Sequence, residues 1–258
     1  MDYSIVDTCE KLVKPGFLVQ LARTGSHAYG LATPESDEDF RGIFIPSKED
    51  LLGMHHTRNI ERKSPDPDIV LKCLEEFLRL ALEGNPNILE QLFIDDENLL
   101  YSHNIFSPFR AHRNMFLSKK VKRTYTGYAI GQLKKMRSGH TRDLGAKRKA
   151  LIEKYSYDTK NCSHVFRLLI QGKEILEKGA LSVKLLPGDA EYVKAIRRGE
   201  IFKTIDEAQV KADELIKNLD DMQSPLPELP DAKFIEDLMI RTQAEYISKD
   251  GIRTMEDK

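Results

Sequence analysis

Cysteine is scarce in this chain of 258 residues, and Cys9, Cys73 and Cys162 are far apart in the sequence. An odd number of scattered cysteines indicates neither a disulfide framework nor a zinc site, so we expect ordinary buried thiols. Long apolar runs are also missing, since no stretch approaches the roughly 18 residues that a bilayer span needs. The N-terminal segment lacks the apolar core of a signal peptide, and we therefore expect a cytoplasmic protein with no membrane partner.

Two common enzyme motifs are absent as well. The sequence contains neither a phosphate-binding G-x-x-x-x-G-K-[ST] loop nor a G-x-S-x-G nucleophile turn. ATPase and esterase activities therefore lack their usual support. No repeat recurs at a fixed period, and a chain of this length with 40% hydrophobic residues can bury the core of one large domain or, more readily, two.

The formal net charge of −1 conceals a strong segregation of charge along the chain. Residues 110–149 hold thirteen Lys or Arg against the single acid Asp143, whereas residues 205–258 hold fourteen acids against seven bases. A basic block of this density attracts the phosphates of nucleotides or of a polynucleotide. The alternative is a solvated helical surface with no such partner.

The apolar patterns predict strands and helices in the first part of the chain, followed by a helical domain. Residues 17–24 and 39–46 have the composition of strands, and residues 69–82 have apolar positions at helical spacing with Asp68 as the N-cap. From residue 106 onward the pattern is almost wholly helical. We therefore expect a first domain over residues 1–105 and a helical second domain over residues 106–258.

The stretch TGSHAYGLATPESDEDFRGIFIP, residues 24–46, carries the clearest chemistry. Gly25 permits a close backbone approach after the first strand, and Ser26 with the N–H groups of the following helix can bind a phosphate. Asp37 and Asp39 are two residues apart, so on a strand their carboxylates share a face and repel each other unless a cation lies between them. Mg²⁺ suits such oxygen ligands and leaves room for substrate phosphates.

The same residues resemble the signature of the DNA polymerase β-like nucleotidyltransferase superfamily. The branch that this chain resembles is the RNA repair pathway DNA polymerase β family, in which Arg-Gly follows the second aspartate, as Arg41-Gly42 do here. Three later segments are similar to that branch: LEGNPNILEQLF (82–93), YSYDTKNCSHVFRLL (155–169) and LPELPD (226–231). The resemblance implies an α/β (α+β) fold, in which a polymerase β-like core with a small mixed sheet forms the catalytic domain 1–105 and the helical domain 106–258 binds substrate or nucleotide. It further implies transfer of a nucleoside monophosphate with Mg²⁺ or Mn²⁺ as cofactor, and a role in RNA end repair.

Carried over residue by residue, the resemblance implies that Gly25 and Ser26 hold the triphosphate of an NTP such as ATP. It further implies that Asp37 and Asp39 are catalytic residues that bind the metal, as a pair of ions roughly 3.5–4 Å apart in enzymes of this chemistry. Arg41 is expected to point away from both aspartates, toward the opposite face of the strand.

Members of the superfamily that transfer nucleotides also have a third carboxylate on a neighbouring strand, which binds metal and helps to deprotonate the attacking hydroxyl. Our first choice for this catalytic and metal-binding residue is Asp68, followed by Glu61 and then Asp66. The alternative for Asp68 is a simple helix cap.

A further nucleotide-binding group is predicted on the helix that begins near Thr159. Lys160, His164 and Arg167 fall at i, i+4 and i+7, which is one face of a helix, with Asp158 as its cap. Three basic or titratable groups in one stripe suit a triphosphate or an RNA phosphate.

These features predict a magnesium-dependent nucleotidyltransferase that acts on an RNA 3′ end. Two alternatives stay open: transfer to a hydroxyl of a protein or small molecule, and an inactive nucleotide-sensing or RNA-binding protein that lacks the third carboxylate.

Overall fold

The computed structural model describes residues 3–34, 36–54, 59–62, 67–138 and 146–256. The chain divides into two compact units, each described here by itself. The first unit comprises Met1–Glu83, Asn87–Phe116 and Pro230–Lys258, and the second comprises Gly84–Pro86 and Leu117–Leu229. The division expected at residue 105 differs from this one, because residues 106–116 and the C-terminal helix group with the sheet.

The described residues of the first unit contain a mixed sheet in the order β3-β4-β2-β1-β5. Its strands are β1 (Phe17–Thr24), β2 (Asp39–Ile45), β3 (Ile60–Arg62), β4 (Asp68–Cys73) and β5 (Leu99–Ser102). β2 and β4 run parallel, whereas β1 pairs antiparallel with β2 and β5, and β3 antiparallel with β4. The predicted α+β class with a small mixed sheet is confirmed.

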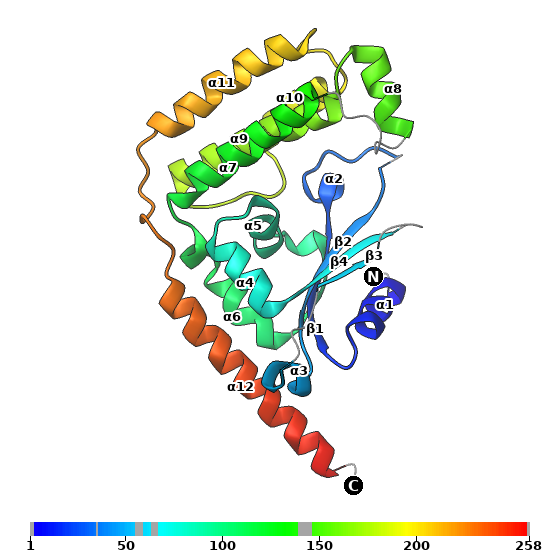
Figure 1. Cartoon of the computed structure of the whole chain (residues 1–258), viewed down its shortest axis with the longest axis vertical. Coiled ribbons are helices and arrows are strands. Elements are labelled where there is room, and N and C mark those ends of the chain that lie inside the picture. The colour runs from blue at the N-terminus through cyan, green and yellow to red at the C-terminus, as the bar shows by residue number, and fades with distance from the viewer. Residues whose placement is uncertain (1–2, 35, 55–58, 63–66, 139–145, 257–258) are drawn as a thin grey trace. The chain divides into compact units, whose positions relative to one another are not determined.

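Helices cover both faces of this sheet. The first unit contains α1 (Tyr3–Val13), α2 (Gly25–Ala28), α3 (Lys48–Leu52), α4 (Leu74–Leu82), α6 (Ser107–Ala111) and α12 (Ala232–Glu256), most of α5 (Pro86–Leu92), and the short 3-10 turns Asp96–Asn98, Asn104–Phe106 and Arg113–Phe116. One side of the sheet packs against α1, where Cys9 and Val13 are buried with Phe40 and Ile69. α4 contacts β2 and β4 from the other side (Figure 1).

The segment 69–82, predicted to be one helix capped by Asp68, is a strand followed by a helix. Asp68 is the first residue of β4, and the helix α4 begins only at Leu74. Burial alternates along β4, with Ile69, Leu71 and Cys73 buried and the residues between them half-buried. Pairing with β2 selects the strand here, and the reading of Asp68 as a helix cap is therefore wrong.

The second unit is helical, as expected for this part of the chain. It contains α7 (Lys120–Arg137), α8 (Ala146–Tyr155), α9 (Thr159–Lys178), α10 (Pro187–Arg197) and α11 (Ile205–Asp221). α9 packs against α7, α10 and α11 and is buried along most of its length (Figure 1). Its ends follow the sequence signals, since Asp158 accepts from the Asn161 N–H at 2.9 Å and Gly179 ends the helix in the left-handed conformation.

Among the described residues, no helix combines the length and the apolar composition that crossing a membrane requires.

Two glycines of the second unit are expected to respond oppositely to alanine. Gly199 has φ +70°, and an added Cβ would lie 2.5 Å from the Tyr155 ring, so Gly199→Ala should lower the free energy of unfolding by about 1–3 kcal/mol. Gly127 lies within α7 with nothing within 4 Å of an added Cβ, so Gly127→Ala should raise it by about 0.5–1 kcal/mol. Urea unfolding measures both, and equal effects would contradict the packing around Gly199.

Candidate functional site

The turn after β1 depends on a glycine for two separate reasons. Gly25 has φ +69°, a conformation that residues with a side chain rarely adopt. A Cβ at this position would also collide with the carboxylate of Asp39. The absence of a side chain at Gly25 therefore lets the turn lie directly against Asp39.

Ser26 lies in a turn that is closed by its own backbone. The Leu31 N–H donates to the Ser26 carbonyl at 2.9 Å, and the Gly30 N–H donates to the His27 carbonyl at 3.2 Å. With only four residues, α2 is too short to act as a strong dipole. Any anion held here would therefore depend on the Ser26 hydroxyl and on N–H groups of the first turn, which have no acceptor within the helix.

Strand pairing places Asp39 and Asp68 side by side. Asp39 pairs with Asp68 across the parallel β2–β4 ladder and with Thr24 across β1. Adjacent strands lie about 4.7–4.9 Å apart and paired residues share a face, so the two carboxylates project together from the side opposite α1. Thr24 contributes a further link, because its hydroxyl donates to the Asp39 carbonyl at 3.2 Å.

Asp68 has an unusual environment for a carboxylate. Its Oδ1 atom is buried and has no hydrogen-bond partner among the described residues. A buried acceptor without a partner costs about 1–3 kcal/mol, so such an atom calls for a ligand that the protein itself does not supply. Carboxylate oxygens in adjacent positions match the donor preference of Mg²⁺.

No group of three or more His, Cys, Asp or Glu side chains in the described part of the chain is arranged to hold a metal ion. Mg²⁺ is usually bound through one or two carboxylates, with water and substrate phosphates completing its shell. Asp39 and Asp68 therefore fit a magnesium site that substrate would complete.

The other predicted acids are placed differently. Asp37 is exposed and precedes the first residue of β2 by two positions, so it lies outside the strand on which it was expected. Glu61 lies on the edge strand β3, opposite Val70, and is exposed. Asp66 lies outside the described residues. Of the three candidates for a third carboxylate, Asp68 is the one paired directly with Asp39.

Arg41 was expected on the opposite face of β2 from the aspartates, and this is wrong. It lies two positions after Asp39 in a regular part of the ladder and pairs with Val70, so it shares the face of Asp39 and Asp68. The intervening Phe40 is the residue that points into the core against α1.

Sequence reasoning missed three residues beside this turn. The Tyr29 hydroxyl donates to Glu90 Oε2 at 2.6 Å, and Glu90 on α5 is only 5% exposed. The Nε2 atom of His27 is buried without a hydrogen-bond partner in the described chain. His27 could have been found from the sequence, because it directly follows Gly25-Ser26. No pattern in the neighbouring sequence indicates that Tyr29 contacts Glu90.

Exposure falls along the predicted stripe on α9. Lys160 is exposed, His164 is half-buried and Arg167 is only 1% exposed. The other side of α9, with Cys162, Val165, Phe166 and Leu169, is buried in the core as predicted. The stripe and the Gly25–Ser26 turn belong to different units.

Several residues of the basic block at 110–149 make ion pairs or hydrogen bonds within the second unit. Lys119 pairs with Glu228 at 2.7 Å, and Arg137 pairs with Asp206 at 2.7 Å. Lys122 Nζ donates to the Asp220 and Met222 carbonyls at the end of α11. Glu228 and Asp206 thus neutralise two of these bases, while Arg123, Lys134, Lys135 and Lys149 are exposed and make no ion pair in the described chain.

The three cysteines are free and buried, as expected. Burial raises the pKa of the Cys9 thiol to about 11 and that of the Cys162 thiol to about 12. Both groups are therefore protonated at neutral pH, which suits neither a nucleophile nor a zinc ligand.

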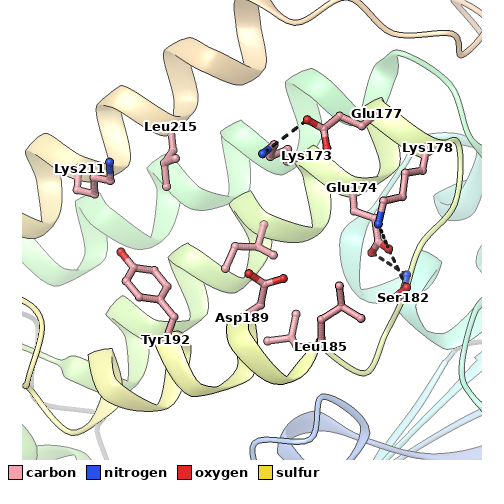
Figure 2. Close-up of a pocket in the computed structure, with 12 residues that line it drawn as sticks. Lys173, Glu174, Glu177, Lys178, Ser182, Leu185, Asp189, Tyr192, Lys211 and Leu215 are labelled. Atoms are coloured by element: carbon pink, nitrogen blue, oxygen red, sulfur yellow. Dashed lines mark hydrogen bonds and ion pairs between the residues drawn. The ribbon is translucent and has the colours of Figure 1, made fainter.

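A cavity of about 450 Å³ opens among α9, α10 and α11 of the second unit (Figure 2). Its charged lining consists of Lys173, Lys178, Lys211, Glu174, Glu177 and Asp189, so three lysines balance three acids. Lys173 and Lys178 already pair with Glu177 and Glu174 at 3.6 and 3.5 Å. None of the predicted site residues lines this cavity, and its balanced charge favours no ligand class.

Comparison with known proteins finds one family over most of the chain. The sequence profile of the RNA repair pathway DNA polymerase beta family matches residues 16–241. A phage T4 protein, described as "Uncharacterized 38.9 kDa protein in nrdC-mobD intergenic region", is 33% identical over 122 residues, which are 43% of this chain and 36% of that protein. The chain therefore spans little more than a third of this relative's length.

Among solved structures, a nucleotidyltransferase-like protein from Exiguobacterium sibiricum matches with a TM-score of 0.32 and 11% identity, covering 83% of this chain and 73% of that one.

The unpartnered oxygen of Asp68 predicts how stability responds to a divalent cation. Mg²⁺ should raise the melting temperature of the wild-type protein, since a ligand at one hundred times its Kd adds about 2.7 kcal/mol. Asp68→Asn should lose this response to Mg²⁺. Without Mg²⁺, this variant should unfold at the same urea concentration as the wild type or at a higher one. Glu61→Gln is the matched control and should keep the response. Equal stabilisation of Asp68→Asn by Mg²⁺ would exclude Asp68 as a metal ligand.

Proposed function

The chain belongs to the RNA repair pathway DNA polymerase beta family, and on that premise we propose that it is a magnesium-dependent nucleotidyltransferase. In this proposal a nucleoside monophosphate passes from an NTP to an acceptor hydroxyl, which is an RNA 3′ end. The observation that carries the proposal is the pairing of Asp39 with Asp68 beside the Gly25–Ser26 turn, with a buried Asp68 oxygen that no described residue satisfies.

Each of these residues has a role in the proposed reaction. Ser26 and the N–H groups of its turn bind triphosphate oxygens, and Gly25 lets the turn approach Asp39. Asp39 and Asp68, with Asp37 proposed as a further ligand, would hold Mg²⁺, and the bound ion would neutralise charge on the phosphates.

Asp68 is also the general base of the proposed transfer. Its carboxylate accepts the proton of the attacking hydroxyl, whose oxygen forms a bond to the α-phosphorus. The bond from that phosphorus to the bridging oxygen breaks, and pyrophosphate leaves. The buried Oδ1 atom suits this role, because no neighbouring donor in the described chain competes for it.

An RNA acceptor is supported by the family and by the charges that folding leaves exposed. Arg123 and Lys134 lie eleven residues apart on α7, which places them on one helical face. Exposed bases that make no internal ion pair are available to phosphate groups, which attract them strongly at low salt. A cytoplasmic location, expected from the sequence, agrees with such a substrate.

The decisive experiment follows the transfer of label. The purified protein is incubated with Mg²⁺, each α-labelled NTP in turn, and acceptors that include tRNA, short RNA, DNA and protein. Label on an RNA 3′ end is the expected result, and the NTP that works identifies the base. The Asp37→Ala/Asp39→Ala variant should reduce labelling by a factor of about 10³ or more, because it removes the metal ligands.

Glu61→Gln is the control, because it removes the charge of an exposed acid on the edge strand of the sheet. This variant should leave labelling unchanged. Label on a protein or small molecule would replace RNA as the acceptor. NTP binding without any transfer, unaffected by Asp68→Ala, would overturn the enzymatic proposal in favour of a nucleotide sensor.

A further inference from the structure

We propose that Arg41 binds the acceptor: its guanidinium contacts the phosphate next to the 3′-hydroxyl of the attacking RNA strand. The inference deepens the proposed function and rests on it for the reaction that the acceptor enters. It assigns a substrate class to the site, because a polynucleotide carries a phosphate at that place, whereas a protein hydroxyl has none.

Arg41 is a half-buried cation without an anion beside it. It makes no hydrogen bond and no ion pair within the described part of the chain. A guanidinium has N–H donors, no acceptor and a permanent positive charge, so partial burial is favourable only when an anion meets it. The described chain supplies no such anion, and a bound substrate can.

The strand register places Arg41 beside the two carboxylates of the site. Arg41 pairs with Val70, one row beyond the pair formed by Asp39 and Asp68. Residues two apart on a strand share a face and lie about 7 Å from each other, so the guanidinium belongs to the same site as the carboxylates. It forms no ion pair with either of them in the described chain, and in the proposed function both are engaged with Mg²⁺.

Burial shows that a ligand can extend from the carboxylates to Arg41. Arg41 and its neighbour Val70 are half-buried, as both aspartates are. In the next row along β1 and β2, Gln20 and Ile43 pair with each other and are 0% exposed. On these two strands the accessible part of the face therefore ends at Arg41.

The order of the groups along β2 places Arg41 on the acceptor side. The turn at Gly25 lies directly against Asp39, the first residue of β2, and Arg41 is two positions further along the strand. The carboxylates therefore lie between the turn and Arg41. In an in-line transfer the attacking and leaving oxygens are on opposite sides of the α-phosphorus. With the triphosphate at the turn, the acceptor enters from the side of Arg41.

An arginine suits this place because of what an RNA acceptor offers there. The charged group nearest to the attacking 3′-hydroxyl is the phosphate of the same nucleotide. The planar guanidinium can bind two oxygens of one phosphate at once, which fixes orientation as well as position. Contact with Arg41 would therefore hold the hydroxyl near the carboxylates and favour polynucleotide acceptors.

The first test measures binding of a short single-stranded RNA and, separately, of ATP with Mg²⁺. Arg41→Gln should weaken RNA binding about tenfold or more, the loss of a hydrogen bond between charged groups, and leave ATP binding unchanged. The slope of log affinity against log salt concentration should fall by about 0.7, the value for one phosphate contact on a single strand. Arg41→Lys should retain part of the affinity.

Arg62→Gln is the matched control. It removes the same charge from an exposed residue of the same sheet, and Arg62 pairs with Ile69, so it lies on the opposite face from Arg41. This variant should bind RNA as the wild type does. Equal losses in the two variants would mean that only general surface charge matters, and would overturn the proposal.

The second test removes the phosphate instead of the arginine. The probe is an RNA whose last phosphate is a neutral methylphosphonate on a 2′-deoxy sugar, compared with the same strand carrying an ordinary phosphate. The wild type should bind the neutral probe about tenfold more weakly, whereas Arg41→Gln should bind both equally. Additive losses would show that Arg41 acts elsewhere and would overturn the proposal.

The remaining outcomes separate this inference from a structural role and from the proposed function. Arg41→Gln should unfold at the same urea concentration as the wild type, since it loses no partner within the described chain, and a clear loss of stability would overturn the inference. Weaker ATP binding with unchanged RNA binding would overturn it in favour of a triphosphate contact. Transfer of label to RNA with an unchanged KM for RNA in Arg41→Gln would overturn the inference alone. The expected binding pattern without any transfer would overturn the proposed function alone.

Discussion

The parallel pairing of β2 with β4 is the constraint on which the candidate site depends. Two carboxylates in adjacent strand positions repel each other, and like charges directly opposite destabilise a sheet. The register is held by the alternate residues, because Phe40 pairs with Ile69 and both are buried against α1. A slip of one residue would move this apolar pair to the opposite face, so burial of the core keeps Asp39 beside Asp68.

Glycines let the surrounding backbone come close enough for this arrangement. Gly25 leaves room for the Asp39 carboxylate, and an added Cβ on Gly42 would lie 2.6 Å from the Leu71 side chain. Both glycines belong to the stretch that resembles the family signature, and both have a packing reason in this chain. These two glycines are therefore explained by close packing, in addition to any role of the stretch in binding phosphate or metal.

Some charged residues of the second unit hold its helices together, which the composition does not reveal. The basic residues of α7 and the acidic residues of α11 are far apart in the sequence, yet Arg137 meets Asp206 and Lys122 meets the end of α11. On α9, the buried Arg167 likewise donates a hydrogen bond to Gln171. The bases on one helix thus differ, because some are exposed and others are bonded to groups distant in the sequence or are buried.

The sequence by itself determined the elements whose signals are local. Composition predicted the strand 17–24, a capping aspartate and a terminal glycine predicted the limits of α9, and the stretch that holds Gly25, Ser26, Asp37 and Asp39 resembles the family signature. Tertiary structure alone decided the rest: that Asp68 begins a strand, that it pairs with Asp39, and that Arg167 is buried and donates to Gln171. These depend on pairing and burial between segments distant along the chain, and local propensity carries no information about which distant segments meet.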